Sequence, residues 1–223
     1  VGIPFSDPLA DGPIIQRASG RSLEHGTTPH AVFRLMRRVA GQVRVPLVLL
    51  SYWNPILQYG NGRAKATDPT PFVRAATQSG VAGVIVPDLP PEEAGAWRAA
   101  AGQGGLETIF LASPTSSAHR LRQIAHASEG FIYYVSLTGT TGVRDQLASA
   151  WQQQVRQLKL VTTKPVCVGF GISTPAQANA VTRVADGVIV GSALIRALET
   201  HRANRRTMAA SARAFLRRFR AVV

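Results

Sequence analysis

The sequence predicts a parallel α/β fold and, within that class, a TIM (β/α)8 barrel. Three observations support this prediction. Short apolar runs rich in β-branched residues recur along the chain at about the spacing of a βα unit, and segments with helical period lie between them. Polar, glycine-rich and acidic residues follow one run after another, as they do where the loops after the strands line one mouth of a barrel.

The predicted strands are near-continuous apolar runs, which is typical of strands buried on both faces. The opening VGIPFS is the end of one such strand. The complete runs occupy residues 45–52, 83–88, 107–113, 131–136, 165–171 and 187–192. Because a barrel closes with eight strands, we expect the first βα unit and most of the second strand to lie upstream of Val1. Residues 1–223 are therefore predicted to form a single, N-terminally incomplete barrel domain.

The predicted helices carry apolar residues on one face and start signals in their first turns. In the segment AVFRLMRRVA the apolar residues are expected to share a face. These residues are Val32, Leu35, Met36 and Val39. Proline near a first turn favours a helix that begins there. Such starts are predicted at Thr70-Pro71, at Pro90-Pro91 and at Thr174-Pro175.

An open doubly wound sheet is the alternative architecture for this alternation of strands and helices. It would be expected to show a G-x-G-x-x-G turn after its first strand and an acidic residue at the end of its second. The sequence contains no such pair. The barrel is therefore favoured.

Composition points to a folded protein of a reducing compartment. The chain is 45% hydrophobic, enough for a core, and 17% charged, too little for a disordered chain. No apolar run approaches the ~18 residues that a membrane span needs. A single cysteine, Cys167, excludes an intrachain disulfide. We therefore expect a cytoplasmic protein with no membrane partner.

The chain is strongly basic, and this charge has two interpretations. Lys and Arg number 25 against 12 acids, a net charge of +13, and Arg is densest in residues 196–220. One interpretation is a nucleic-acid partner. We favour the other, a solvated helix face, because these Arg residues stand among apolar residues at helical spacing, with neither zinc-finger spacing nor an aromatic RNA-stacking motif. The charge then bears on solubility and non-specific binding, and no specific nucleic-acid partner is expected.

Glycine-rich loops in the last third of the chain predict a phosphate site. GFGISTP (169–175) leads from a predicted strand into a helix start, and Gly191-Ser192 does the same after the next strand. Glycine lets a backbone approach a ligand closely, and free amides at a helix N-terminus favour an anion. Gly139 and Gly142, after the preceding strand, could close the site. Each glycine alone could be a tight turn, but three such loops favour phosphate, since barrels build this site after their last strands.

Three aspartates come just after predicted strands, where catalytic groups of a barrel lie. Asp7 is followed by Pro8 and is expected to cap a helix or form an Asx-turn, and Asp88 in PDLPPEE is expected to shape its loop. Asp11 is the better candidate for contact with substrate. The histidines show no pair at metal-ligand spacing, so no metal site is predicted.

Six stretches of the chain resemble the alpha subunit of tryptophan synthase, in the order of that family and over residues 1 to about 200. They are VGIPFSDPLADGPIIQ, SYWNPILQYG, GVIVPDLPPEEA, GFIYYVSLTGTTGVR, GFGISTPAQ and the later GS. The resemblance implies a TIM-barrel lyase of tryptophan biosynthesis, which cleaves indole-3-glycerol phosphate by a retro-aldol reaction into indole and glyceraldehyde 3-phosphate. It implies a partner, the beta subunit, with which the chain would form an alpha2beta2 tetramer. Pyridoxal phosphate would belong to the beta subunit, and this chain would have no cofactor.

The resemblance also assigns roles to residues of this chain. Asp11 matches the carboxylate that stabilises charge at the indole N–H, and the side chains that line the pocket or order its lid match Tyr52, Tyr133 and Thr141. The phosphate site of the family matches Gly142, Gly171, Gly191 and Ser192. The face that meets the beta subunit matches Pro4, Asp7, Asn54 and Pro90.

Two departures from the family pattern accompany these assignments. The acid–base glutamate of the family matches a position one residue upstream of Val1, so the resemblance predicts that the chain of residues 1–223 is impaired as an enzyme. Leu137 stands where well-known members have an arginine.

Two alternatives remain at this point: another phosphate-binding barrel enzyme of amino-acid biosynthesis, and an electrostatic nucleic-acid binder. The first would not be expected to share PFSDPLADGP or PDLPPEE.

Overall fold

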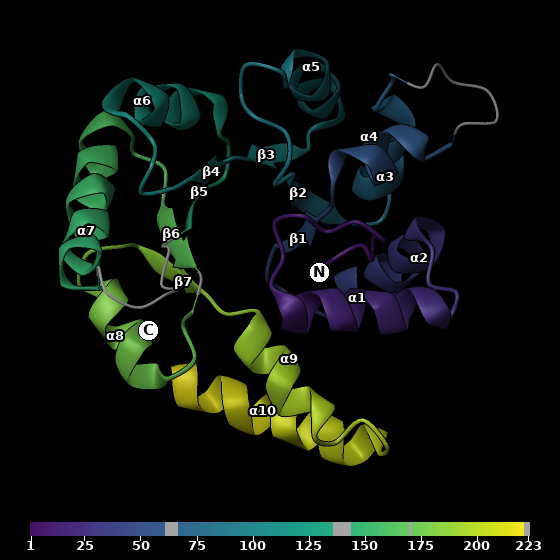
Figure 1. Ribbon diagram of the computed structural model, residues 1–223. Helices are drawn as coiled ribbons and strands as arrows, with labels where there is room; N and C mark the ends of the chain where they lie inside the picture. The colour runs from purple at the N-terminus through teal and green to yellow at the C-terminus, as the bar shows by residue number, and fades with distance from the viewer. Residues whose placement is uncertain (61–66, 136–143, 170, 221–223) are drawn as a thin grey trace. The chain divides into compact units, whose positions relative to one another are not determined.

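The computed structural model describes residues 1–60, 67–135, 144–169 and 171–220 (Figure 1). The chain forms two compact units. The first comprises Val1–Asp11, Gln16–Leu111 and Ala127–Gly130, and the second comprises Gly12–Ile15, Ala112–His126 and Phe131–Val223. Whether residues 1–223 form one domain stays a prediction.

The first unit is built on a three-stranded parallel sheet in the order β1-β2-β3. Its strands are β1 (Leu47–Leu50), β2 (Val81–Ile85) and β3 (Glu107–Ile109). The opening residues lie beside β1: Gly2 forms a parallel bridge with Leu50, and the Ile3 amide donates to the Leu50 carbonyl at 2.9 Å. This is where the sequence predicts the end of a further strand.

The helices of the first unit are α1 (Pro13–Glu24), α2 (Pro29–Ala40), α3 (Trp53–Gln58), α4 (Thr70–Thr77) and α5 (Gly95–Gly104). Helices α2 to α5 bury side chains in its core. The face of α2 differs from the prediction, because Phe33 is buried and Leu35 is 48% exposed. Phe33 packs edge-on against Phe72 with ring centroids 5.2 Å apart. This aromatic contact rotates the packed face of the helix away from Leu35.

The predicted helix starts are right at two of three places. Helix α4 begins at Thr70, and α8 (Pro175–Thr182) begins behind an N-cap at Thr174. After Pro90-Pro91 the helix begins only at Gly95. The amides of Glu93 and Ala94 donate to carbonyls three residues back, so these residues form a turn before the helix.

The second unit is built on a four-stranded sheet in the order β4-β5-β6-β7. Its strands are β4 (Leu111–Ala112), β5 (Ile132–Val135), β6 (Val166–Gly169) and β7 (Gly187–Ile189). The predicted strand 107–113 is therefore divided between β3 and β4. The division falls at Phe110, whose amide donates to Ser128 Oγ at 3.3 Å instead of to a neighbouring strand.

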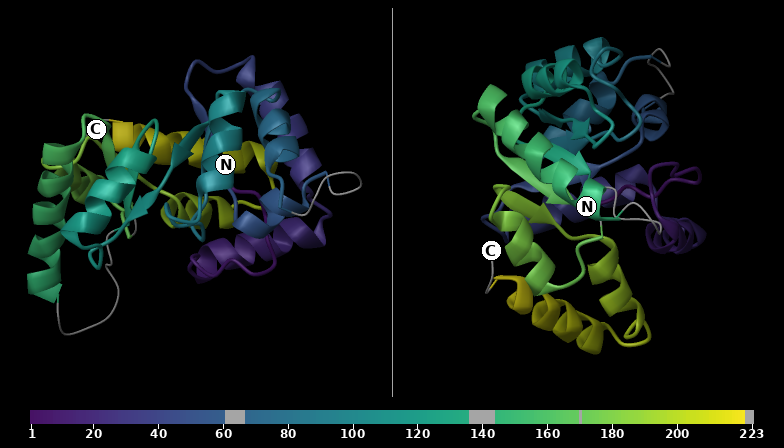
Figure 2. Two further views of the ribbon diagram at one scale, coloured as in Figure 1. Left: turned by 90° about the horizontal axis from the view of Figure 1, so that it is seen from above. Right: turned by 60° about the vertical axis from the view of Figure 1, so that its left-hand side comes forward.

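The helices of the second unit are α6 (Ala118–Ala127), α7 (Arg144–Val161), α8, α9 (Ser192–Glu199) and α10 (Arg205–Arg220). Helices α7 and α8 pack against β6 and β7, and α10 packs against α9 and α8 (Figures 1 and 2). In the described part of the chain, every helix is either too short or too polar to cross a lipid bilayer.

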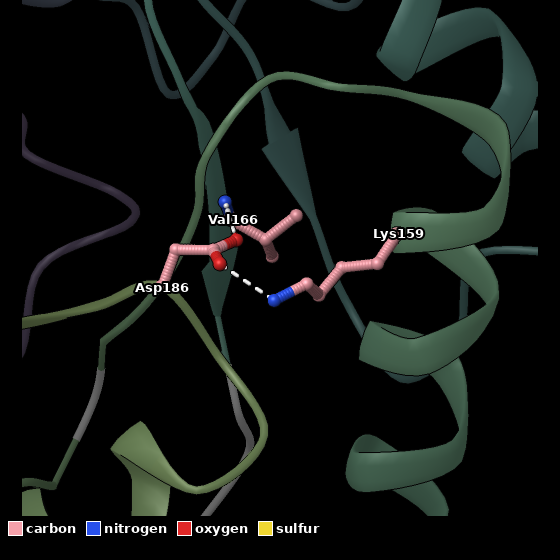
Figure 3. Close-up of polar contacts among 3 residues, drawn as sticks. All are labelled: Lys159, Val166 and Asp186. Atoms are coloured by element: carbon pink, nitrogen blue, oxygen red, sulfur yellow. Dashed lines mark hydrogen bonds and ion pairs between the residues drawn. The ribbon is translucent and has the colours of Figure 1, made fainter.

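Asp186 ties three elements of the second unit together (Figure 3). Its carboxylate accepts a hydrogen bond from the Val166 amide at 2.9 Å and one from Lys159 Nζ at 2.5 Å. Burial raises the pKa of Asp186, but the hydrogen bonds from Lys159 and Val166 outweigh burial and hold that pKa below its usual value. The ionised carboxylate thus joins α7, β6 and the start of β7.

Candidate active site

Asp11 and Tyr52 form a hydrogen-bonded pair in the first unit. Tyr52 comes two residues after β1 and stands at the N-cap of α3, with its side chain buried. Its hydroxyl donates to Asp11 Oδ2 at 3.0 Å and accepts from the Ala10 amide at 3.0 Å. Two bonds therefore fix the Tyr52 hydroxyl, and through it one oxygen of Asp11. The structure brings together two residues that the sequence assigned to one site.

The electrostatics of this pair set the direction of its hydrogen bond. Burial raises the pKa of Tyr52 well above its usual value, and the charge of Asp11 raises it further. Burial also raises the pKa of Asp11, which the bond from Tyr52 partly offsets. Tyr52 therefore stays a donor at neutral pH and Asp11 an acceptor. Among the described residues, no group donates to the other oxygen of Asp11, Oδ1.

Asp88 holds the PDLPPEE loop to the same region. Both of its carboxylate oxygens accept from the amide of Trp53, at 2.9 and 3.1 Å. Trp53 is the first residue of α3, so Asp88 caps that helix from a distant loop. The structure confirms a loop-shaping role for Asp88. It also links the loop to the residue next to Tyr52.

The glycine loops of the second unit follow two neighbouring strands. Strands β6 and β7 pair in parallel, with Gly169 opposite Ile189. Gly171 comes two residues after β6, with φ +74, and Gly191 comes two residues after β7. Because the carboxyl ends of paired parallel strands lie at one edge of a sheet, both loops start from the same edge. This is the arrangement that the sequence predicts for a phosphate site.

The two helix N-termini after these loops differ in their capping. At α8, Thr174 and Gln177 form a capping box, and Gln177 Oε1 also accepts from the Ser173 amide at 2.9 Å. At α9, Gly191 is the N-cap, and no side chain of the residues that the structure describes accepts from the first turn. The open amides are therefore those of α9, beginning with Ser192. The T-x-x-Q signature of the box at α8 is visible in the sequence and was missed there.

Tyr133 lies on β5, next to β6, and its ring packs against Gly169 of β6. A Cβ atom at Gly169 would stand 2.5 Å from the Tyr133 ring. Gly169 therefore makes room for this ring, a packing role that sequence reasoning did not identify. The half-buried Tyr133 shares its face of the sheet with Cys167, its partner in register. Burial raises the pKa of the Cys167 thiol, and the charge of Asp186 raises it further, so the thiol stays protonated.

The residues predicted for a partner face lie in three segments of the first unit. Asp7 and Asn54 are exposed, whereas Pro4 and Pro90 are half-buried. The Asp7 carboxylate accepts from the Ser6 hydroxyl, so the predicted helix cap or Asx-turn is wrong for this side chain. Its backbone carbonyl accepts from an amide two residues on, at 2.9 Å.

Three residues of the predicted site lie outside the described residues. They are Thr141, Gly142 and, from the glycine-rich loop of the predicted phosphate site, Gly139; Leu137, the departure from the family pattern, lies outside them as well. Within the described ranges, no cluster of three or more His, Cys, Asp and Glu side chains is placed to hold a metal ion.

Comparisons with known proteins agree on one family. The profile of the family described as "Tryptophan synthase alpha chain" matches residues 1–223. The alpha chain of Geotalea daltonii is 48% identical over 199 residues, which cover 89% of this chain and 72% of that protein. That of Gloeobacter violaceus is 49% identical over 201 residues, covering 90% and 70%. The crystal structure of the alpha subunit from Legionella pneumophila str. Paris aligns with a TM-score of 0.84 at 39% identity, covering 99% of this chain and 79% of that one.

These findings confirm the predicted fold class, the TIM (β/α)8 barrel. Tryptophan synthase alpha chains are lyases of tryptophan biosynthesis, and their reaction is the retro-aldol cleavage of indole-3-glycerol phosphate. They work with a beta subunit. With a family match over residues 1–223 and relatives near half identity, this chain belongs to the tryptophan synthase alpha chain family.

Proposed function

We propose that Asp11 is the carboxylate that stabilises the indole ring during cleavage, and that Tyr52 holds it in place. Protonation of indole C3 in a retro-aldol step places positive charge on the ring nitrogen. A carboxylate that accepts from the N–H stabilises this charge. Asp11 is suited to this role because one oxygen is held by Tyr52 at 3.0 Å and the other has no donor among the described residues.

The phosphate group is bound, in this proposal, by the loops after β6 and β7. Gly171 and Gly191 let the backbone approach the anion, and the uncapped first turn of α9, beginning at Ser192, supplies amides and the positive end of a helix dipole. The capped N-terminus of α8 contributes less, because Gln177 already occupies two amides of its loop. Gly142 is proposed as a third member by resemblance alone.

Tyr133 and Thr141 complete the proposed substrate contacts. The ring of Tyr133 is held against Gly169 on a half-buried face of the sheet, which suits a group that lines an apolar substrate. The assignment of Thr141 rests on resemblance. This chain is proposed to need no cofactor of its own, and pyridoxal phosphate is proposed to belong to the beta subunit.

The beta subunit is proposed to dock on Pro4, Asp7, Asn54 and Pro90, in an alpha2beta2 tetramer. What supports this is exposure and stiffness: Asp7 and Asn54 are exposed, and the neighbouring prolines limit the entropy that their loops lose on association. Leu9, in the same opening loop as Asp7, is 90% exposed, which is unusual for so large an apolar side chain. A cytoplasmic location is proposed from the single cysteine.

The observation that carries the catalytic proposal is the hydrogen bond from Tyr52 to Asp11. Asp11→Asn tests it, in an alpha chain that carries the acid–base glutamate before Val1. The substitution keeps the shape of the side chain and removes its charge, so we expect kcat/KM for indole-3-glycerol phosphate to fall about 100- to 1,000-fold, the cost of losing one preorganised charge-stabilising group. Asp7→Asn, in the same loop and exposed, is the control and should change turnover by the isolated chain less than threefold. Equal effects of the two variants would reject the role of Asp11.

A further inference from the structure

Helix α10 carries a line of exposed arginines that the proposed function does not use. The four members, here called the arginine stripe, are Arg206, Arg213, Arg217 and Arg220. At about 100° per residue they fall within about 60° of arc, and at about 1.5 Å per residue they span about 21 Å along one side of the helix. All four are exposed. The helix holds six arginines and no acid.

The opposite side of α10 is fixed within the second unit. Phe219 is buried, and its ring packs on that of Phe215 with centroids 4.8 Å apart. Ser211 Oγ donates to the Ala197 carbonyl of α9 at 3.1 Å, and Asn204 Oδ1 caps the helix by accepting from the Arg206 amide at 2.9 Å. The helix is thus held with its aromatic side inward. The arginine stripe is consequently the side that faces away from α9.

The stripe has no counter-charge of its own. None of its four guanidinium groups forms an ion pair or a side-chain hydrogen bond with any described residue. Solvated helix faces usually mix both signs of charge, because unopposed like charges along a helix repel one another. Four aligned guanidinium groups therefore carry an electrostatic cost that an anionic partner would remove.

Small residues between the arginines leave a shallow groove of about 440 Å³ along the helix. It is lined by Arg206, Ala209, Ala210, Arg213, Ala214 and Arg217. No apolar lining residue is larger than alanine. A protein partner usually needs an aromatic or large aliphatic anchor at such a surface. A phosphate backbone needs none, since its contacts are charge and hydrogen bonds to planar guanidinium groups.

We propose that the arginine stripe binds the phosphate backbone of double-stranded nucleic acid without reading its sequence. The groove offers no aromatic ring on which an unpaired base could stack, which disfavours single strands. The aromatic side of α10 is packed inward, so the helix cannot lie in a membrane interface on that side. Along one strand, phosphates recur at about 3.4 Å of helix axis, so about 21 Å of stripe faces enough phosphates for all four guanidinium groups.

The salt dependence of binding tests the proposal quantitatively. The 223-residue chain is titrated against a fluorescein-labelled 20-base-pair DNA duplex, and affinity is read from fluorescence anisotropy. Four phosphate contacts predict a slope of about −3.6 in log K against log salt, an affinity loss of about 150-fold from 50 to 200 mM. The variant R213Q/R217Q/R220Q should retain a slope of about −0.9. Glutamine keeps helix propensity, and circular dichroism checks that α10 stays folded.

Helix α2 supplies a matched control for net charge. Its residues Arg34, Arg37 and Arg38 are also exposed on one helix, and R34Q/R37Q/R38Q lowers the net charge from +13 to +10, as the stripe variant does. We expect this control to keep a slope within about 1 of the unmodified chain. Equal slopes for the two variants would overturn the proposal, because binding would then follow net charge. Displacement of the duplex by polyglutamate at equal charge concentration would also overturn it, in favour of an acidic protein partner.

Discussion

Replacing Tyr52 by phenylalanine separates a positioning role from a merely structural one. The change removes a single oxygen, which donates to Asp11 Oδ2 and accepts from the Ala10 amide, both at 3.0 Å. Ala10 is exposed, so water can satisfy its amide. The expected loss of stability is therefore that of the bond to the charged Asp11, about 1.5–3 kcal/mol.

The catalytic loss should be of the same size in free energy as the loss of stability. A hydrogen bond to a charged acceptor contributes about 1.5–3 kcal/mol, and each 1.36 kcal/mol is tenfold in rate. If the bond holds Asp11 for the indole N–H, kcat/KM should fall about 10- to 150-fold in Tyr52→Phe. The effect should appear mainly in kcat, because the bond matters most when charge develops on the ring.

The pH profile supplies the readout that a structural role would not move. Burial raises the pKa of Asp11, and the hydrogen bond from Tyr52 partly offsets this by lowering it. Asp11 acts ionised, so activity falls as pH falls through its pKa. Removing the bond raises that pKa, and the acid limb of kcat/KM should move to higher pH.

Tyr134→Phe is the control for this experiment. Tyr134 is buried and its hydroxyl donates to Gln154 Oε1 at 2.6 Å, so the variant also loses a hydroxyl and a hydrogen bond. It should lose about 1 kcal/mol of stability in urea unfolding, the usual net contribution of a neutral hydrogen bond, and leave the acid limb in place. If the acid limb of kcat/KM keeps its pH position in Tyr52→Phe, or moves equally in both variants, the reasoning is refuted.

Two further predictions concern the second unit. Gly191→Ala should weaken inorganic phosphate binding at least tenfold in calorimetry. Its stability should change little, since φ at Gly191 is −109° and the nearest atom to a new Cβ is 3.9 Å away. Gly171→Ala should also cost about 1 kcal/mol of stability, because φ at Gly171 is +74°. Undiminished phosphate affinity in folded Gly191→Ala would reject the site. Asp186→Asn should cost about 1 kcal/mol of unfolding free energy at pH 7, measured in urea. Because the folded pKa of Asp186 lies below its usual 3.8, this contribution is present above pH 3.8 and is lost as pH falls below it. A difference in stability between the two proteins that persists at pH 2 would contradict the role of Asp186.

The strands were predictable because burial on both faces leaves a signal that needs only local sequence. Every complete apolar run overlaps a strand of the structure, although β2 begins two residues before its run. The division of one run at Phe110 was not predictable, because the group that takes its amide, Ser128, stands 18 residues away. The packed face of α2 was missed for a similar reason. Leu35 and Phe33 are both apolar, and only the distant ring of Phe72 decides between them.

The site was predictable where it depends on backbone chemistry and unpredictable where it depends on pairing. Glycine after a strand already indicates a loop that can approach a ligand, and Gly171 does have the positive φ that favours glycine. No local pattern shows that Tyr52 donates to a carboxylate 41 residues earlier. Resemblance placed both residues at one site, but their bond, its direction and the open oxygen of Asp11 come from the structure.

Capping decides which of two similar helix N-termini can still bind an anion. Both α8 and α9 follow a glycine loop at the same edge of the sheet, and sequence reasoning treated the loops alike. At α8 the Gln177 side chain accepts from the amides of Ser173 and Thr174, which supplies negative partial charge where a phosphate would sit. At α9 the N-cap is glycine, which has no side chain to compete. A phosphate near these loops should therefore be held mainly by α9, so adding an aspartate at Gly191 should harm binding far more than adding one at Ser173.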